Sequence, residues 1–217
     1  MVKNVKVLAI NPENIFDRLK LCWGHLKDWQ HLEIMQKSKE WLEKTNALFT
    51  PTTFIAYING SPVGIIEFIP QKIMKKIGLC PCRADPEKKE IKSRYILGKE
   101  FDNCLFISCL WVSKDHQGKG VGKTLLDHFL NSEVFQNSKG ALVYVTQRDE
   151  RWDKHIHWPA GSNEFYLKAG FTIEKTLNKP VGYLLYYRNP KAYNHKRNTS
   201  RILEDLDKSL KPVTLSP

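Results

Sequence analysis

Apolar positions in the first part of the chain change their period several times, and each change predicts a different element. Residues 5–10 form an apolar run of strand length that ends at Asn11-Pro12. Apolar side chains at helical spacing then predict a helix over Ile15–Trp23, with Asn14 as its cap, and a second helix over residues 36–48. One strand is thus followed by two helices.

Alternating and continuous apolar runs predict the remaining strands. Residues 53–58 and 63–69 flank an Asn59-Gly60 turn and are typical of an antiparallel hairpin. The run Leu105–Val112 is β-branched and aromatic and predicts a further strand. The elements predicted after it are a helix from Val121 to about residue 135, a strand over 141–145, a short helix over 163–169 capped by Asn163, and a closing antiparallel pair over 171–173 and 183–187.

Glycines space the segment between the strand Leu105–Val112 and the helix that follows it. The segment reads Gln117, Gly118, Lys119, Gly120, Val121, Gly122, Lys123. A strand, a glycine loop and a helix in this order present main-chain N–H groups and the positive end of a helix dipole to an anion. Because glycine has no side chain, a phosphate can approach the main chain closely. The segment therefore predicts a phosphate-binding site.

Two kinds of phosphate loop have to be distinguished here. The nucleoside-triphosphate loop G-x-x-x-x-G-K-[ST] matches at Gly122-Lys123-Thr124, but its first glycine would fall on Gln117. The magnesium-binding acid of such a loop would also come late, since Asp149 lies well past the next apolar strand. The pattern Q/R-x-x-G-x-G/A is matched in full by Gln117, Gly120 and Gly122.

At this loop the chain resembles the GCN5-related N-acetyltransferase (GNAT) family, whose pyrophosphate loop has this pattern. A strand ending Leu110-Trp111-Val112 precedes the loop, and Phe165-Tyr166 is followed after three residues by Gly170-Phe171, as in that family. The resemblance implies the GNAT acyl-CoA N-acyltransferase fold, in the α/β (α+β) class. This fold has a mixed, mostly antiparallel central sheet of about six or seven strands flanked by helices.

The same resemblance implies acetyl-CoA as acyl donor and assigns residues to it. The diphosphate would lie against residues 117–123, and the pantetheine arm would enter a slot where strand 141–145 diverges from Leu105–Val112. Main-chain groups from Leu110 through Trp111 to Val112 would pair with the arm and stabilise the oxyanion. Tyr166 matches the acid that protonates the leaving thiolate, and Asn163 is the candidate for an asparagine that bonds the coenzyme.

The reaction implied is direct attack on the thioester by a primary amine of a small molecule or a protein. An ammonium group must lose a proton first, and many relatives carry a carboxylate in the strand before the loop. This chain has Ser108 and Cys109 there. Glu67, on the neighbouring hairpin strand, is the predicted base, acting directly or through a water; Ser108, Cys109 and His157 are the alternatives.

Composition adds a strong positive charge to this description. The chain has 217 residues, a hydrophobic content of 41%, and 34 Lys and Arg against 23 Asp and Glu, for a formal net charge of +11. The charge is interpreted either as a solvated lysine-rich surface or as attraction for acidic partners such as coenzyme phosphates, an acidic acceptor or nucleic acid. No nucleic-acid-binding motif accompanies it, so that interpretation depends on charge alone.

Cysteine usage and hydropathy bear on compartment and metals. Five cysteines, an odd number, favour a reducing compartment, and no apolar run approaches the ~20 residues of a membrane helix. We therefore expect a cytoplasmic protein that does not span a membrane. Cys80-Pro81-Cys82 and the pair His155 and His157 suggest zinc, but one residue between cysteines is too few for a usual zinc knuckle. No metal is expected; reversible oxidation of the two thiols is the other interpretation.

The domain organisation predicted is a single acetyltransferase-like domain over residues 1–190, interrupted by a basic insertion over 71–102, and a basic C-terminal appendage over 191–217. Either a monomer or a homodimer fits. Two alternatives to an acceptor-specific acetyltransferase stay open: an acyl-CoA-binding regulatory protein without turnover, and an acetyltransferase associated with nucleic acid.

Overall fold

The computed structural model describes residues 4–23, 30–77, 97–146, 162–178 and 181–192. One seven-stranded sheet runs through it in the order β1-β2-β3-β4-β5-β7-β6. The strands are β1 (Lys6–Ala9), β2 (Thr53–Ile58), β3 (Ser61–Pro70), β4 (Leu105–Val112), β5 (Gly140–Thr146), β6 (Thr172–Asn178) and β7 (Val181–Arg188). All neighbouring strands are antiparallel except β4 and β5, which are parallel. The predicted mixed, mostly antiparallel sheet is confirmed.

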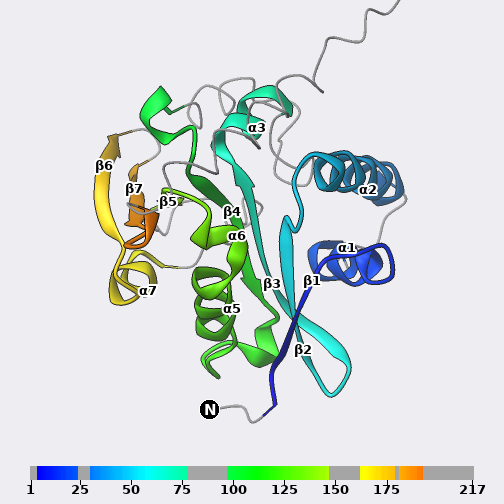
Figure 1. Ribbon diagram of the computed structural model, residues 1–217. Coiled ribbons are helices and arrows are strands. Elements are labelled where there is room, and N and C mark those ends of the chain that lie inside the picture. Colours follow the sequence, from blue (N-terminus) through cyan, green and yellow to red (C-terminus); the bar gives the residue numbers. More distant parts are fainter. Residues whose placement is uncertain (1–3, 24–29, 78–96, 147–161, 179–180, 193–217) are drawn as a thin grey trace, which may run out of the picture.

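Helices cover both faces of this sheet. They are α1 (Ile15–Trp23), α2 (Gln30–Leu48), α3 (Gln71–Ile77), α5 (Val121–Asn131), α6 (Glu133–Gln136) and α7 (Asn163–Lys168), with short 3-10 turns η1 (Lys99–Phe101) and η2 (Lys114–His116). Figure 1 shows α1 and α2 on one side of the central strands and α5 on the other. In agreement, α1 contacts β3 and α2, while α5 contacts β2, β3 and β4.

Two of the predicted helices differ in extent. The second helix begins at Gln30 rather than near residue 36. The helix predicted to continue from Val121 to about residue 135 ends at Asn131, and a separate short helix follows. The break comes at Ser132, whose backbone is extended and whose hydroxyl accepts a hydrogen bond from Phe135 N. A serine in this conformation caps a new helix instead of continuing the old one.

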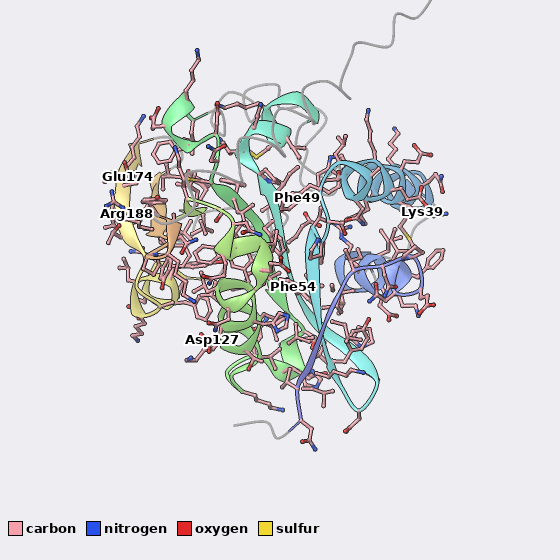
Figure 2. The ribbon with its side chains drawn as sticks, viewed as in Figure 1. Lys39, Phe49, Phe54, Asp127, Glu174 and Arg188 are labelled. Carbon is pink, nitrogen blue, oxygen red and sulfur yellow. The ribbon has the colours of Figure 1, made fainter. Side chains whose placement is uncertain are left out.

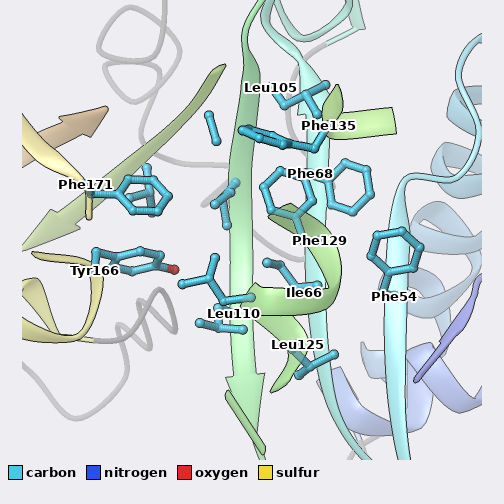
Figure 3. Packing of buried hydrophobic residues seen from close by; sticks show 14 of the residues in the cluster. Phe54, Ile66, Phe68, Leu105, Leu110, Leu125, Phe129, Phe135, Tyr166 and Phe171 are labelled. Atoms are coloured by element: carbon cyan, nitrogen blue, oxygen red, sulfur yellow. The ribbon is translucent and has the colours of Figure 1, made fainter. Parts of the chain in front are cut away.

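The apolar side chains form one cluster on the α5 face of the sheet and two on the face that α1 and α2 cover. On the α5 face, Phe68 packs between Phe54 and Phe129, with ring centroids 5.3 and 4.6 Å away. Figure 3 shows these rings together with Leu110 of β4 and Tyr166 of α7. On the other face, Leu19 of α1 and Leu42 of α2 pack with residues of β3, β4 and β5. Burial of each such side chain is worth about 2 kcal/mol, so both helical layers are firmly attached.

The charged side chains labelled in Figure 2 lie on the outside of these layers. Figure 2 labels Lys39 on α2, Asp127 on α5, Glu174 on β6 and Arg188 on β7, all toward the periphery, whereas Phe54 lies between β2 and α5. Among the described residues, no helix is long and apolar enough to span a bilayer.

The segment predicted to be a basic insertion begins inside the packed domain. Helix α3 opens it, and Ile73 and Met74 are buried in the cluster under α1 and α2. Lys75 of α3 forms an ion pair with Asp102 near the other end of the segment. Residues 78–96, which include Cys80 and Cys82, lie outside the described residues, as do residues 193–217 of the predicted C-terminal appendage.

Candidate functional site

Strands β4 and β5 diverge in the middle of the sheet. Their parallel pairing covers three residue pairs, from Leu105↔Ala141 to Ile107↔Val143. Beyond these pairs β5 continues along β7, while β4 continues along β3 as far as Val112. The main-chain groups of residues 108–112 on the β5 side therefore face no strand in the described part of the chain. Such a free edge is suited to bind an extended chain of amides.

The glycine segment begins where β4 ends. Gln117 donates a hydrogen bond from Nε2 to the carbonyl of Val112 (2.9 Å) and so holds the loop against the strand. Gly118 and Gly120 have φ values of +71° and +91°, in the left-handed region that favours glycine. Apart from its immediate chain neighbours, no described residue comes within 4 Å of the position that a Cβ would occupy at either glycine. The loop therefore presents bare main chain to open space.

Helix α5 starts directly from this loop. Its first helical hydrogen bond runs from Thr124 N to Gly120 O (3.0 Å), so the N–H groups of Val121, Gly122 and Lys123 form the open first turn. Neither Asp nor Glu occupies this turn. Lys123 is exposed and pairs with Asp127 one turn on. Open N–H groups and the helix dipole make this end of α5 suited to an anion.

Tyr166 approaches the diverging strands from helix α7. Its ring is fully buried between Phe165 and Phe171, and it belongs to the same cluster as Leu110 of β4 and Val121 of α5. Figure 3 shows the hydroxyl pointing toward β4 near Leu110. That hydroxyl is buried and has no hydrogen-bond partner among the residues that the structure describes.

The environment of Tyr166 keeps its hydroxyl protonated. Burial, and to a lesser degree the neighbouring Cys109, raises the pKa of Tyr166 well above the ordinary tyrosine value. The group therefore carries its proton throughout the neutral pH range, as a proton donor must. A buried hydroxyl without a partner is unfavourable, and this one is free to donate a hydrogen bond to a ligand that comes near it.

Asn163 is not the cap of α7. Ser162 takes that place, since its hydroxyl accepts a hydrogen bond from Phe165 N (3.3 Å), and Asn163 is the first residue of the helix. Serine and asparagine cap helices about equally well, so residue type alone does not show which of the two begins the helix. The extended backbone of Ser162 makes it the cap. The Oδ1 of Asn163 is buried without a hydrogen-bond partner in the described part of the chain. Its predicted contact with the coenzyme stays a prediction.

The residues of this region fit a ligand that carries a diphosphate at one end and amides further on. The bare loop, the open first turn of α5 and the free edge of β4 follow one another along the chain. The buried hydroxyl of Tyr166 is near them, because Phe165 lies 3.9 Å from the Cβ position of Gly122. An acyl-coenzyme A has this chemistry.

Comparison with known protein families decides the matter. The model of the Acetyltransferase (GNAT) family matches residues 14–146, which is more than half of the chain and includes β4, the glycine loop and α5. The chain belongs to the GNAT family. The resemblance predicted from the loop is thereby confirmed, and so is the assignment to a family of acetyltransferase enzymes.

Solved structures agree with the GNAT fold. An N-acetyltransferase from Staphylococcus aureus Mu50 superposes with a TM-score of 0.56 at 18% identity, covering 84% of this chain and 100% of its own. The PaiA N-acetyltransferase from Thermoplasma acidophilum gives 0.52 at 14% identity (86% and 99% covered), and Ard1 from Thermoplasma volcanium gives 0.51 at 15% (85% and 97%). At these identities the likeness concerns the fold alone. The comparison with curated proteins gave no match.

In this GNAT protein the predicted base, Glu67, lies in a buried polar chain. Its Oε2 accepts hydrogen bonds from Nη2 (2.5 Å) and Nε (3.1 Å) of Arg18 on α1, and both side chains are fully buried. Its Oε1 accepts a hydrogen bond from Ser108 Oγ at 2.9 Å. Both carboxylate oxygens therefore accept hydrogen bonds, and Ser108 is the least buried of the three side chains in this chain of contacts.

Arg18 is not among the residues predicted from the sequence, although a signal was present. Arg18 falls on the apolar face of its helix, between Ile15 and Leu19. In an ordinary surface helix the charged side chains lie on the opposite, solvent-exposed face. An arginine on a buried face requires a buried acid.

Of the other candidates for the base, Cys109 is buried on the α1 side of β4, and His157 lies outside the described residues. Trp111 is half-buried in that same cluster, so only its main chain borders the slot.

Breaking the buried ion pair is expected to destabilise the fold. Arg18→Met leaves the Glu67 carboxylate buried without its cation, and such losses cost about 3–5 kcal/mol of unfolding free energy. Urea denaturation measures this directly. The double variant Arg18→Met/Glu67→Leu should recover most of the loss, because no charge stays unpaired. Lys39→Met, which removes the exposed pair with Glu43 on α2, is the matched control and should cost at most about 1 kcal/mol. A small effect of Arg18→Met would contradict the pairing.

Proposed function

We propose that the protein transfers the acetyl group of acetyl-CoA to a primary amine by direct attack. The observation that carries the proposal is the hydroxyl of Tyr166, protonated, buried and without a described partner, beside the strands β4 and β5 where they diverge. The Thermoplasma acidophilum relative, which shares the fold, was solved in complex with coenzyme A.

Each part of the site has a task in this reaction. The open N–H groups of the loop and of the first turn of α5 would hold the diphosphate. The free edge of β4 from Leu110 to Val112 would bind the amides of the pantetheine arm and donate N–H groups to the thioester oxygen. When bound, acetyl-CoA supplies an acetyl thioester. Tyr166 would give its proton to the departing sulfur.

The amine would approach Ser108 and Glu67. Since Glu67 is fully buried and accepts hydrogen bonds on both oxygens, a contribution of Glu67 as base would pass through the Ser108 hydroxyl. The formal net charge of +11 supports an acceptor with acidic groups, whose long-range attraction to the protein would not depend on a specific contact.

A screen of acceptors tests the proposed function. Purified protein and acetyl-CoA are combined with panels of polyamines, aminoglycosides, amino acids, acidic metabolites that carry an amine, and peptides with a free N-terminus or lysine, and CoA release is followed with a thiol reagent. We expect one class of amine to give release above the acceptor-free rate. If acetyl-CoA binds by calorimetry but no amine class raises the rate, the protein is an acyl-CoA-binding protein without turnover, and the proposal is wrong.

A further inference from the structure

The hydrogen bond between Ser108 and Glu67 has a defined direction. A carboxylate can only accept, so the proton of this bond comes from the Ser108 hydroxyl. The carboxylate itself is held by two donors of Arg18, a residue that cannot be deprotonated in a protein. The chain from Arg18 through Glu67 to Ser108 therefore ends in a hydroxyl whose proton is already engaged and whose oxygen offers only lone pairs to a further partner.

Ser108 lies where β4 leaves β5. The last β4 residue paired with β5 is Ile107, so Ser108 is the first residue past the divergence. It is also the extra residue of a β-bulge, because Glu67 pairs with Cys109 and Phe68 pairs with Ile107 on either side of it. Unlike Glu67 and Cys109, Ser108 is only half-buried. Its hydroxyl contacts Glu67 of β3, while its main chain lies on the strand edge that β5 leaves.

Ser108 and Tyr166 approach the opening from opposite faces of the sheet. The Ser108 hydroxyl contacts Glu67, which binds Arg18 of α1 on one face. Tyr166 packs with Val121 and Leu125 of α5 on the other. A hydroxyl that can donate a proton thus lies on one side, and an oxygen that can only accept lies on the other. A leaving thiolate needs a proton donor such as the Tyr166 hydroxyl. An attacking nitrogen, which carries N–H bonds, needs a hydrogen-bond acceptor such as the Ser108 oxygen.

We infer that the Ser108 oxygen accepts a hydrogen bond from an N–H of the attacking amine, and that Glu67 and Arg18 position it for this contact. The inference rests on the proposed function and adds the residue that orients the acceptor. Glu67 keeps the serine proton turned away from the amine, and Arg18 keeps the carboxylate in place. Orientation of the nitrogen is therefore set by three residues from α1, β3 and β4.

The direction of this chain can be reversed by one substitution. In Glu67→Gln the carbonyl oxygen of the amide should face Arg18, which offers only donors, so that the NH₂ group faces Ser108. Ser108 then accepts from the amide, which takes one of its lone pairs, and its own proton is left to face the incoming N–H or the more distant main-chain carbonyl of residue 67 at 3.3 Å. In the double variant Arg18→Met/Glu67→Gln the amide is free to turn its oxygen back to Ser108. A purely steric role of Ser108 predicts no difference between these two variants.

The test measures binding with a probe whose N–H occupies the place of the attacking nitrogen. The probe is CoA joined through its sulfur and an acetamide group to propylamine, a stable adduct in which the amide N–H replaces the amine. Calorimetry gives the Kd of this probe and of CoA alone for each variant. The ratio of the two isolates contacts at the nitrogen, because the diphosphate and pantetheine are common to both ligands.

Ser108→Ala should weaken the probe by about tenfold and leave the Kd of CoA unchanged, the usual effect of losing one hydrogen bond. Ser108→Thr, which keeps the hydroxyl, should restore the wild-type ratio. Glu67→Gln should weaken the probe in the same direction as Ser108→Ala although the serine is intact, and Arg18→Met/Glu67→Gln should recover most of the affinity. Thr172→Ala, which removes a hydroxyl on the distant edge strand β6, is the control and should change neither constant.

The outcomes separate the inference from the function that it assumes. Wild-type protein that binds neither CoA nor the probe would overturn both. Two results would overturn the role of Ser108 and leave the proposed function standing. In the first, the wild-type protein binds CoA but binds the probe no more tightly. In the second, Ser108→Ala changes the Kd of both ligands equally or changes neither. Equal ratios for Glu67→Gln and the double variant would overturn the positioning role of Glu67.

Discussion

Gly120→Glu is expected to lower the affinity for acetyl-CoA by more than about 100-fold while the protein stays folded. Residue 120 precedes helix α5 with φ at +91°, and its Cβ position faces open space in which the diphosphate is proposed to lie. A carboxylate there would occupy that space and repel the phosphates from the positive end of the helix. Loss of several main-chain hydrogen bonds to a charged group accounts for the size of the effect.

A second glycine provides the matched control for this experiment. Gly60, in the β2–β3 turn, has a φ of +78° and equally open space at its Cβ position, but it is not part of the glycine segment 117–123. Gly60→Glu introduces the same charge and the same backbone strain, about 1–2 kcal/mol for a residue other than glycine in this region. Thermal unfolding should show similar losses for both variants, and calorimetry should show lost coenzyme binding only for Gly120→Glu. Micromolar binding retained by Gly120→Glu would contradict the assignment of the loop.

Tyr166→Phe is expected to lower kcat by about 100-fold or more with little change in the affinity for acetyl-CoA. A positioned acid commonly contributes a factor of about 10²–10⁴, and phenylalanine keeps the ring but not the proton. The variant should also be more stable than wild type, by about 1 kcal/mol, since it removes a buried hydroxyl that has no described partner. Higher stability together with lower activity is the combination expected of a group kept for catalysis and not for folding.

Tyr186→Phe serves as the control for the loss of a tyrosine hydroxyl. Tyr186, on β7, donates a hydrogen bond to the carbonyl of Lys139 at 3.2 Å, away from the diverging strands. Its removal should reduce stability slightly and leave kcat unchanged, the reverse of Tyr166→Phe in both measurements. If Tyr166→Phe retained full kcat with the amine found in the screen, another group would have to protonate the sulfur.

Local pattern was sufficient for most of the fold. The strand runs 53–58 and Leu105–Val112 agree with the structure because alternation and β-branching act over a few residues at a time. The pairing of β7 between β5 and β6 was not predictable in the same way. Neighbours in sequence, β6 and β7, form a hairpin, but which of the two contacts β5 depends on long-range packing that no short pattern encodes.

In the candidate site, too, some features could be predicted from the sequence and others could not. The glycine loop was predictable because its chemistry is carried by consecutive residues and by backbone conformation. The partner of Glu67 was not predicted, because Arg18 lies 49 positions earlier and reaches it only through the packing of α1 on β3. Ser108 was named only as an alternative base. Its hydrogen bond to Glu67 and its place in a bulge follow from the register of two strands, which a single sequence does not give.

Only three residue pairs join β4 to β5, although on its other side β5 is paired over its whole length and β4 at every residue except the bulged Ser108. The sheet therefore consists of two antiparallel ribbons that share a short seam. A change in the twist of one ribbon against the other widens or narrows the gap without breaking a hydrogen bond inside either ribbon. The hydrogen bonds inside each ribbon thus determine how rigid the ribbon is, and the few bonds between β4 and β5 determine how far the gap between the ribbons can open.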